Sequence, residues 1–201
     1  VSVLYGARIG NGNVIFPGAV ISAVPQDLKF RGEDTTAEVG DNNKIRENVT
    51  INRGTAAKGK TCVGSGNLLM ESVHVAHDAF VGNDCIIGNG TKLAGEIIID
   101  DHAIISANVL MHQFCRVGGY TMVGGGTRFS QDIPPYTICA REPVAYCGLN
   151  LVGLRRRGFS NELIENIHNT YRIIYQGGVP LNEALQKVRE EVPASPEINY
   201  I

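Results

Sequence analysis

The chain has 201 residues, 43% of them hydrophobic, and a formal net charge of -2. This length suffices to bury a sizeable core in one or two domains, and the charge gives no basic excess of the kind that nucleic-acid partners attract. The chain lacks both the roughly 18 to 20 apolar residues of a membrane span and the layout of a signal peptide. We therefore expect a cytoplasmic protein that neither spans a membrane nor binds nucleic acid.

The cysteine and glycine contents narrow the fold class. The five cysteines are an odd number with no C-x-x-C pair, so reduced, packed thiols are expected rather than a disulfide framework or a thiolate zinc site. The 24 glycines are typical of a fold made of short strands and tight turns. The cysteines are Cys62, Cys85, Cys115, Cys139 and Cys147.

A six-residue repeat dominates the first two thirds of the chain. Aliphatic or aromatic residues occupy every sixth position from Val63 to Phe129 without a break, and the same spacing recurs at 3–21 and at 39–51. A period of six fits neither an α-helix nor an ordinary hairpin, but it fits a coil of three short strands joined by tight corners. The pattern predicts a parallel β-helix of 18-residue coils in which the repeated apolar residue points inward and neighbouring coils stack about 4.8 Å apart.

Two interruptions separate the runs of the repeat. A strict repeat tolerates insertions only as loops that leave its corners. The first, at 22–38, includes Pro25 to Asp34 and is a candidate binding loop, although a surface excursion without function is an equal alternative. The second, at 53–62, is rich in Gly and Lys, and we expect a plain solvated loop.

Beyond Phe129 the sequence changes from strands to helices. The paired prolines of the segment 132–136 are expected to close the strand ladder. Ser160 can cap a helix that Gly177 and Gly178 stop, and Pro180 can open a second helix before Pro193. The predicted domains are therefore a β-helix at 1–143 and a helical domain at 144–201.

The 18-residue coil makes vertical neighbours computable. His77 falls beneath Gly95, Gly95 beneath Gln113, and Asp78 beneath Glu96. A carboxylate beside an imidazole can hold one tautomer, so the ring can act as a general base. A bare backbone N–H one coil above can donate to a developing oxyanion. Because His–Asp adjacency alone is weak evidence, the whole column carries this prediction.

The other candidate groups leave alternatives open. His74 and His112 flank inward positions two coils apart, and some enzymes on such a scaffold use three histidines to bind zinc and hydrate carbon dioxide. His102 and His168 have no evident partners and are expected to be surface residues. The segment Arg155 to Arg157 could bind phosphate or an acidic carrier protein, or could be a solvated basic turn.

Six short motifs together carry a family resemblance. The chain resembles the UDP-N-acetylglucosamine O-acyltransferases, hexapeptide-repeat transferases that catalyse the first step of lipid A biosynthesis, over essentially its whole length. The resemblance implies a left-handed parallel β-helix followed by a small α-helical domain, assembled as a homotrimer. The motifs are QDLKF at 26–30, HVAHD at 74–78, LAG at 93–95, HQFC at 112–115, DIPPY at 132–136 and GLRRRGFS at 153–160.

The resemblance also implies a reaction and its residues. A 3-hydroxyacyl chain passes from the phosphopantetheine of an acyl carrier protein to the 3-hydroxyl of UDP-N-acetylglucosamine, without a metal or other cofactor. His77 is the implied general base, Asp78 its supporting carboxylate, and the backbone N–H of Gly95 the oxyanion donor. Gly125, which the coil places above Ala107, is implied to set acyl chain length. The implied substrate-binding residues are Asp27, Lys29, His74, Glu96, His112, Gln113, Gly125, Asn150, Arg156 and Arg157.

The chain departs from the family pattern in several places. Glu96 stands where the family commonly has His, Ala107 where Gly is common, and Val152 where an acidic residue is common. The family also has N-terminal coils that these 201 residues do not include. The alternative functions are a zinc carbonic anhydrase, a sister N-acyltransferase acting on an amine, and a scaffold without catalytic activity.

Overall fold

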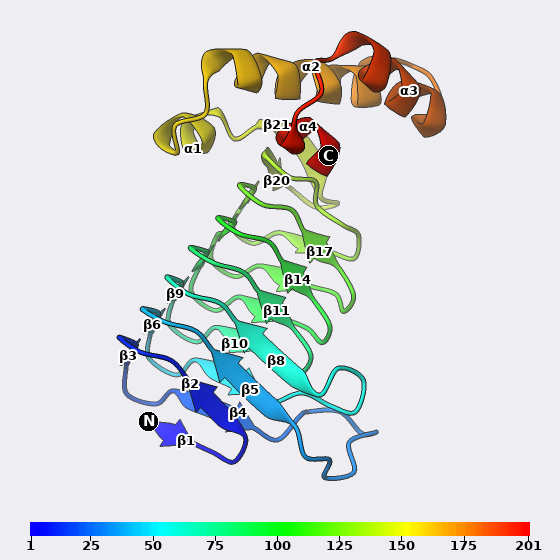
Figure 1. The fold of residues 1–201 in the computed structure, drawn as a ribbon. Helices are drawn as coiled ribbons and strands as arrows, with labels where there is room; N and C mark the ends of the chain where they lie inside the picture. Colours follow the sequence, from blue (N-terminus) through cyan, green and yellow to red (C-terminus); the bar gives the residue numbers. More distant parts are fainter. The chain divides into compact units, whose positions relative to one another are not determined.

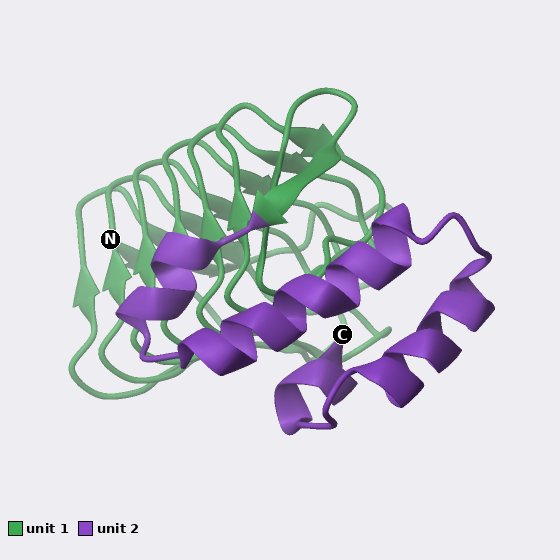
Figure 2. Ribbon diagram, turned by 90° about the horizontal axis from the view of Figure 1, so that it is seen from above, with its two compact units in different colours: residues 1–148 green, residues 149–201 purple.

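The computed structural model describes residues 1–201 and contains two compact units, Val1–Gly148 and Leu149–Ile201 (Figures 1 and 2). The first unit is a left-handed parallel β-helix, so the predicted fold class is confirmed. Its coils form three sheets of parallel strands, which we call sheets A, B and C. Sheet A consists of β1 (Ser2–Val3), β4 (Val20–Ala23), β7 (Thr50–Asn52), β10 (His74–Val75), β13 (Lys92–Leu93), β16 (Leu110–Met111) and β19 (Arg128–Phe129). Sheet B consists of β2 (Ala7–Ile9), β5 (Thr36–Val39), β8 (Lys60–Val63), β11 (Phe80–Val81), β14 (Ile98–Ile99) and β17 (Arg116–Val117). Sheet C consists of β3 (Val14–Ile15), β6 (Lys44–Ile45), β9 (Leu68–Leu69), β12 (Ile86–Ile87), β15 (Ile104–Ile105), β18 (Met122–Val123), β20 (Thr137–Ala140) and β21 (Ala145–Leu149).

The register of the strands confirms the 18-residue coil. Ile87 pairs with Ile105 in sheet C, and Val75 pairs with Leu93 in sheet A. Across the first interruption, partners are 30 residues apart, and across the second they are 24 apart. Each interruption is thus an insertion into one coil, and both insertions leave the β-helix between a strand of sheet A and a strand of sheet B.

The repeated apolar residues form the core of the β-helix. Every residue of the register from Val63 to Phe129 is buried, with at most 5% of its surface exposed. In the two N-terminal runs, Ile21 and the residues at 39, 45 and 51 are buried as well, whereas Ile9 and Ile15 are partly buried and Val3 is 55% exposed. Small residues such as Ala79 and Thr91 are also buried and fill the corners. This continuous apolar column is the main source of stability, at roughly 25 cal/mol for each Å² of apolar surface buried.

Three stacked asparagines reinforce one corner inside the first coils. The Oδ1 of Asn13 accepts a hydrogen bond from the backbone N–H of Asn43 at 2.9 Å, and the Oδ1 of Asn43 accepts one from the N–H of Asn67 at 2.9 Å. The Oδ1 of Asn67 in turn accepts from the N–H of Cys85 at 2.7 Å. The Nδ2 of Asn43 donates to the carbonyl of Gly64 at 2.9 Å. The ladder therefore satisfies backbone groups that the corner leaves without strand partners.

The paired prolines do not close the strand ladder, so this prediction was wrong. Ile133 forms a bridge with Val117, and β20, which follows the prolines, pairs with β18 of the preceding coil. Pro134 and Pro135 lie in the corner between these two pairings, where a missing N–H breaks no ladder bond. Sheet C continues to β21 as its last strand.

The cysteines are all free, in agreement with the prediction of reduced thiols. Cys85, Cys115 and Cys139 are buried, and burial raises the pKa of Cys85 to about 12, which keeps it protonated and inert. Cys147 is exposed, however, so the expectation that all five are packed was wrong for this residue.

The second unit contains four helices. As predicted, Ser160 caps α2, its Oγ accepting from the N–H of Leu163 at 3.1 Å, and Pro180 precedes α3. The helices are α1 (Leu151–Arg156), α2 (Asn161–Gln176), α3 (Leu181–Glu191) and α4 (Pro196–Tyr200). No helix in the chain combines the length and the apolar run that crossing a bilayer demands.

The first and last helices were not predicted. Arg155 and Arg156 lie in the last turn of α1, not in a turn before the first helix. The side chain of Asn150 caps α1 by accepting from the N–H of Gly153 at 3.2 Å. Ser195 caps α4 similarly. Both helices are too short to show an apolar period in the sequence.

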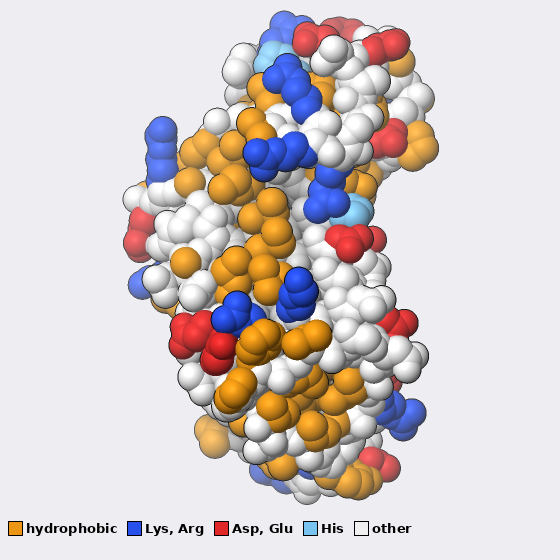
Figure 3. Space-filling model, turned by 90° about the vertical axis from the view of Figure 1, so that its left-hand side faces the viewer, with side chains coloured by type: hydrophobic (Ala, Val, Ile, Leu, Met, Phe, Trp, Pro, Cys, Tyr) orange, Lys and Arg blue, Asp and Glu red, His pale blue; other side chains and the backbone are white.

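The outer face of sheet C is apolar over much of its length. Its outward side chains are neighbours because the register aligns them. Figure 3 shows hydrophobic side chains gathered in a band along the side of the β-helix where β3, β6 and β9 lie. From β9 to β20 the outward residues of this row are Leu68, Ile86, Ile104, Met122 and Ile138, and they follow Val14 on β3 and Lys44 on β6.

The asparagine ladder predicts a stability loss. Asn43→Ala leaves the N–H of Asn67 and the carbonyl of Gly64 without partners in a buried corner, so it should lower the free energy of unfolding by about 1–3 kcal/mol. Urea unfolding at fixed protein concentration measures this loss. The matched control, Asn89→Ala, removes an exposed amide and should change stability by less than about 0.5 kcal/mol. Equal effects of the two substitutions would contradict a stabilising ladder.

Candidate active site

The corner between sheet A and sheet B, here called the A–B corner, collects most of the predicted site residues. Both insertions leave the β-helix at this corner, and His77 lies on it. Because the coils stack, residues far apart in sequence come together along this edge. The corner is formed by the segments 24–35, 53–59, 76–79, 94–97 and 112–115.

His77, Asp78 and Gly95 come together at the A–B corner. The Nδ1 of His77 lies 2.8 Å from the Oδ2 of Asp78. A Cβ added to Gly95 would lie 2.7 Å from Cε1 and 2.8 Å from Nε2 of the same ring, so only glycine leaves room for the imidazole. The Asp78 carboxylate favours the tautomer with hydrogen on Nδ1, which leaves Nε2 able to accept a proton beside the Gly95 backbone.

Asp78 is a buried carboxylate held by several donors. Its Oδ1 accepts from the backbone N–H of Thr55 at 2.9 Å, and its Oδ2 accepts from the Thr55 hydroxyl at 2.6 Å. The backbone N–H of Asp78 donates to the Thr61 hydroxyl at 2.8 Å. Burial alone would raise the pKa of Asp78, but the hydrogen bonds from Thr55 and His77 hold it below its usual value. The carboxylate therefore stays charged and orients the imidazole.

The second insertion is not the plain solvated loop that the sequence suggested. It contributes Thr55, which is buried against Asp78, and Lys58, whose Nζ lies 3.8 Å from the Oε2 of Glu96. Glu96 itself has a positive φ of 60° at the turn, and its N–H donates to the carbonyl of His77 at 3.1 Å. In the sequence, these contacts could have been anticipated only from the position of the loop, one coil beneath His77.

His74 lies on β10, one residue before the inward Val75. Its Nδ1 is 2.7 Å from the hydroxyl oxygen of Thr50. Burial lowers the pKa of His74, and the nearby positive charges of Lys92 and His77 lower it further. The ring is therefore neutral at pH 7 and offers one donor and one acceptor.

His112 and Gln113 lie further along the A–B corner and are both exposed. The Nδ1 of His112 is 3.2 Å from the carbonyl oxygen of Gln113. His112 also lines a groove of about 890 Å³ together with Leu110, Arg128 and Pro143. The lining of the groove mixes apolar side chains with polar ones, which besides His112 and Arg128 include Ser130, Gln131 and Glu142.

Asp27 and Lys29 occupy the loop formed by the first insertion. The Oδ1 of Asp27 accepts from the backbone N–H of Lys29 at 2.9 Å, which fixes a turn. The Lys29 side chain is exposed, and Leu28 between them is 95% exposed. The loop thus presents its polar and apolar side chains to solvent.

Gly125 lies away from this cluster, on the corner that follows β18 in sheet C. A Cβ added there would approach the Ala107 carbonyl oxygen at 3.4 Å, in agreement with the predicted column. Space for a small side chain is thus tight but present.

The remaining candidates belong to the helical unit. Asn150 is buried, and its Oδ1 accepts from Gly153 as the cap of α1. Arg156 ends α1, Arg157 follows it, and both side chains are exposed. Val152 is 60% exposed on the same helix.

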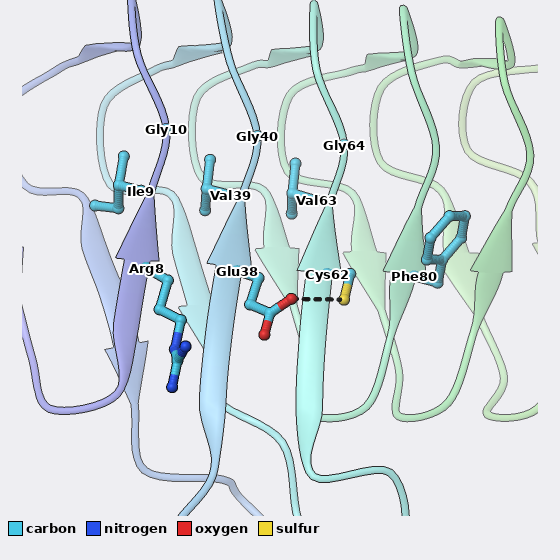
Figure 4. A pocket seen from close by; sticks show the side chains of 10 residues that line it. All are labelled: Arg8, Ile9, Gly10, Glu38, Val39, Gly40, Cys62, Val63, Gly64 and Phe80. Carbon is cyan, nitrogen blue, oxygen red and sulfur yellow. Dashed lines mark hydrogen bonds between the residues drawn. The ribbon is translucent and has the colours of Figure 1, made fainter.

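A groove on sheet B contains none of the predicted site residues. This groove of about 570 Å³ runs across the sheet, where Glu38 accepts a hydrogen bond from Cys62 at 4.0 Å (Figure 4). Glu38 also accepts a hydrogen bond from Lys60 at 3.0 Å. Within the chain, no three His, Cys, Asp or Glu side chains lie close enough together to hold a metal ion.

Comparisons with known proteins place this site in a family. A family model described as Udp N-acetylglucosamine O-acyltransferase, Domain 2, matches residues 132–201. The solved structure of a UDP-N-acetylglucosamine acyltransferase from Bacteroides fragilis 9343 is 75% identical, with a TM-score of 0.97 over 99% of this chain and 78% of that one. The chain belongs to the UDP-N-acetylglucosamine O-acyltransferase family.

More distant structures agree with this assignment. The UDP-N-acetylglucosamine O-acyltransferase from Moraxella catarrhalis RH4 is 40% identical, with a TM-score of 0.93 over 97% of this chain and 76% of that one. The Francisella novicida UDP-N-acetylglucosamine acyltransferase is 37% identical, with a TM-score of 0.94 over 98% and 74%. The chain is therefore an acyltransferase, and the expectation drawn from its motifs is confirmed at the level of the family.

The contacts of Asp78 predict a pH-dependent stability change in this acyltransferase. Thr55→Val removes the hydroxyl donor and should lower the free energy of unfolding at pH 7 by about 1.5–3 kcal/mol. Because the folded-state pKa of Asp78 lies below its ordinary 3.8, this contribution is present above pH 3.8 and is lost as the pH falls through the folded value. Urea unfolding at pH 7 and near pH 3 should therefore show a smaller difference from wild type at the lower pH.

A matched control for this measurement exists in the β-helix. The Oγ1 of Thr127 is buried without a hydrogen-bond partner, so Thr127→Val should cost little at either pH. A Thr55→Val loss that does not shrink in acid would contradict a link to the Asp78 charge.

Proposed function

We propose that this acyltransferase moves a 3-hydroxyacyl chain from acyl carrier protein to the 3-hydroxyl of UDP-N-acetylglucosamine, the first step of lipid A biosynthesis. The observation that carries the proposal is the contact of the His77 ring with both the Asp78 carboxylate and the Gly95 backbone. Membership of a family named for this acceptor supports the substrate. The cytoplasmic location predicted from the sequence is part of the same proposal.

The proposed reaction uses one base and one backbone donor. The Nε2 of His77 takes the proton of the sugar 3-hydroxyl while Asp78 stabilises the imidazolium that forms. The alkoxide oxygen bonds to the thioester carbon, and the Gly95 N–H donates to the resulting oxyanion. When the tetrahedral intermediate collapses, the carbon–sulfur bond breaks, and the phosphopantetheine sulfur leaves with the proton from His77. The products are the 3-O-acyl nucleotide sugar and the free carrier thiol, and no metal takes part.

In this proposal, most of the substrate-binding residues belong to the β-helix. In the β-helix, Asp27, Lys29, His112 and Gln113 share the A–B corner with His77, so one extended ligand can reach all of them. His74 offers a neutral imidazole close to the same base. In the helical unit, the resemblance assigns binding roles to Asn150, Arg156 and Arg157. The guanidinium groups of the two arginines suit phosphate.

A homotrimer is also part of the proposal. The outward row of sheet C, from Leu68 to Ile138, is a line of apolar side chains that needs a covering surface. A flat face of this kind suits a threefold ring in which one face of each prism packs on another face of its neighbour. Sedimentation equilibrium that gives the mass of a single chain would contradict this arrangement.

The base assignment predicts a large rate loss. Removing a general base typically costs roughly 10² to 10⁴ in rate. His77→Ala should therefore lower kcat by that factor, measured by mass spectrometry of the product formed from UDP-N-acetylglucosamine and a panel of 3-hydroxyacyl carrier proteins. His168→Ala, which removes an exposed imidazole of the helical unit, is the control and should keep wild-type turnover. Near wild-type kcat in the His77 variant would refute the assignment.

The implied role of Gly125 predicts a change in the preferred length of the acyl chain. In Gly125→Met a flexible side chain would start 3.4 Å from the Ala107 carbonyl and fill the space of the acyl chain end. Donor preference should shift toward shorter 3-hydroxyacyl chains, which a competition assay with mixed donors resolves in one product spectrum. Gly126→Asn is the control, because this neighbouring open position has a φ of 71° that Asn tolerates, as Asn108 does one coil below. An unchanged profile in the Gly125 variant would count against the hypothesis.

A further inference from the structure

Glu96 places a negative charge next to the proposed oxyanion donor. It directly follows Gly95, and its N–H is fixed by the His77 carbonyl. Its side chain is 25% exposed, so water screens the carboxylate only partly. Because the proposed intermediate carries negative charge at this donor, an uncompensated carboxylate here would oppose the reaction.

Lys58 supplies the opposite charge from the second insertion. Its Nζ lies 3.8 Å from the Oε2 of Glu96 and is 41% exposed. Lys58 precedes the strand that pairs beneath β11, so its side chain reaches past the coil of His77 to the coil of Glu96. Lys58 forms an ion pair with Glu96, whereas Arg53, the other basic residue of this loop, lies over the rings of Tyr5 and Phe30.

The loop that carries Lys58 is held at both ends. The N–H of Gly59 donates to the carbonyl of Thr55 at 2.7 Å, and the carbonyl of Gly59 accepts from the N–H of Thr36 at 3.0 Å. Thr55 is bound to Asp78 by two hydrogen bonds. A loop anchored in this way keeps the Lys58 backbone in one place, which lowers the entropic cost of pairing its long side chain.

We propose that Lys58 is a positioning residue for acyl transfer. Paired with Glu96, it cancels the carboxylate charge beside Gly95 and holds the Glu96 side chain over the acceptor site. One loop thus orients both carboxylates of the site, Asp78 through Thr55 and Glu96 through Lys58. This inference rests on the proposed function.

A double-mutant cycle tests the inference. Wild type, Lys58→Met, Glu96→Gln and the double variant are compared for kcat and for KM of UDP-N-acetylglucosamine, with Lys58→Arg as the charge-preserving variant. Lys58→Met should lower kcat roughly 10-fold, less than the 10²–10³ typical for loss of a whole oxyanion donor. In the Glu96→Gln background the same substitution should leave kcat unchanged, since no charge remains to cancel. Lys58→Arg should restore most of the lost kcat.

Each other outcome decides against the pairing. If Lys58→Met raises KM with kcat intact, and does so equally in the Glu96→Gln background, Lys58 contacts the substrate directly. If Lys58→Met behaves as wild type, the pair is only a solvated surface contact. Thermal unfolding of each variant separates these readings from misfolding. Absence of transfer by the wild-type chain would overturn the proposed function and this inference with it, whereas loss of the coupling alone would overturn only the inference.

Discussion

The stacking of 18-residue coils is the constraint on which the rest of the structure depends. Each short strand obtains its hydrogen bonds from the coils above and below, because no coil can satisfy its own backbone. The inward side chains, such as Ile87 over Leu69 and beneath Ile105, share one apolar column. The ladder can therefore accept extra residues only at its corners, and both insertions leave at the A–B corner. Most of the predicted site residues lie at this corner, which carries the two inserted loops.

The buried Asp78 shows how such a corner can orient an imidazole. A carboxylate without exposure would ordinarily gain a proton, but the donors from Thr55 and His77 outweigh the cost of burial. The charge in turn fixes the imidazole, and the imidazole requires glycine at position 95. The stacked column thus holds the His77 ring between the Asp78 carboxylate and the Gly95 backbone.

The same corner explains how Glu96 can follow Gly95 without changing the path of the chain. Asp78, Glu96 and Phe114 occupy one column and have φ values of 61°, 60° and 69°. This left-handed turn fixes the backbone whichever side chain follows Gly95, so the substitution leaves the path of the chain intact. What differs is the side chain: Glu96 carries a carboxylate, and Lys58 of the second insertion forms an ion pair with it.

The sequence by itself determined the β-helix, the alignment of His77 with Gly95, and the caps of the two longer helices, because each follows from a fixed period or a local signal. Handedness and the family came from matched motifs. Only the tertiary structure showed that the prolines at 134 and 135 lie within the ladder, that Asn150 caps a helix, and that Thr55 contacts Asp78 and Lys58 pairs with Glu96. Insertions break the period, so their contacts depend on loop conformations that no repeat specifies, whereas residues inside the repeat are placed by counting.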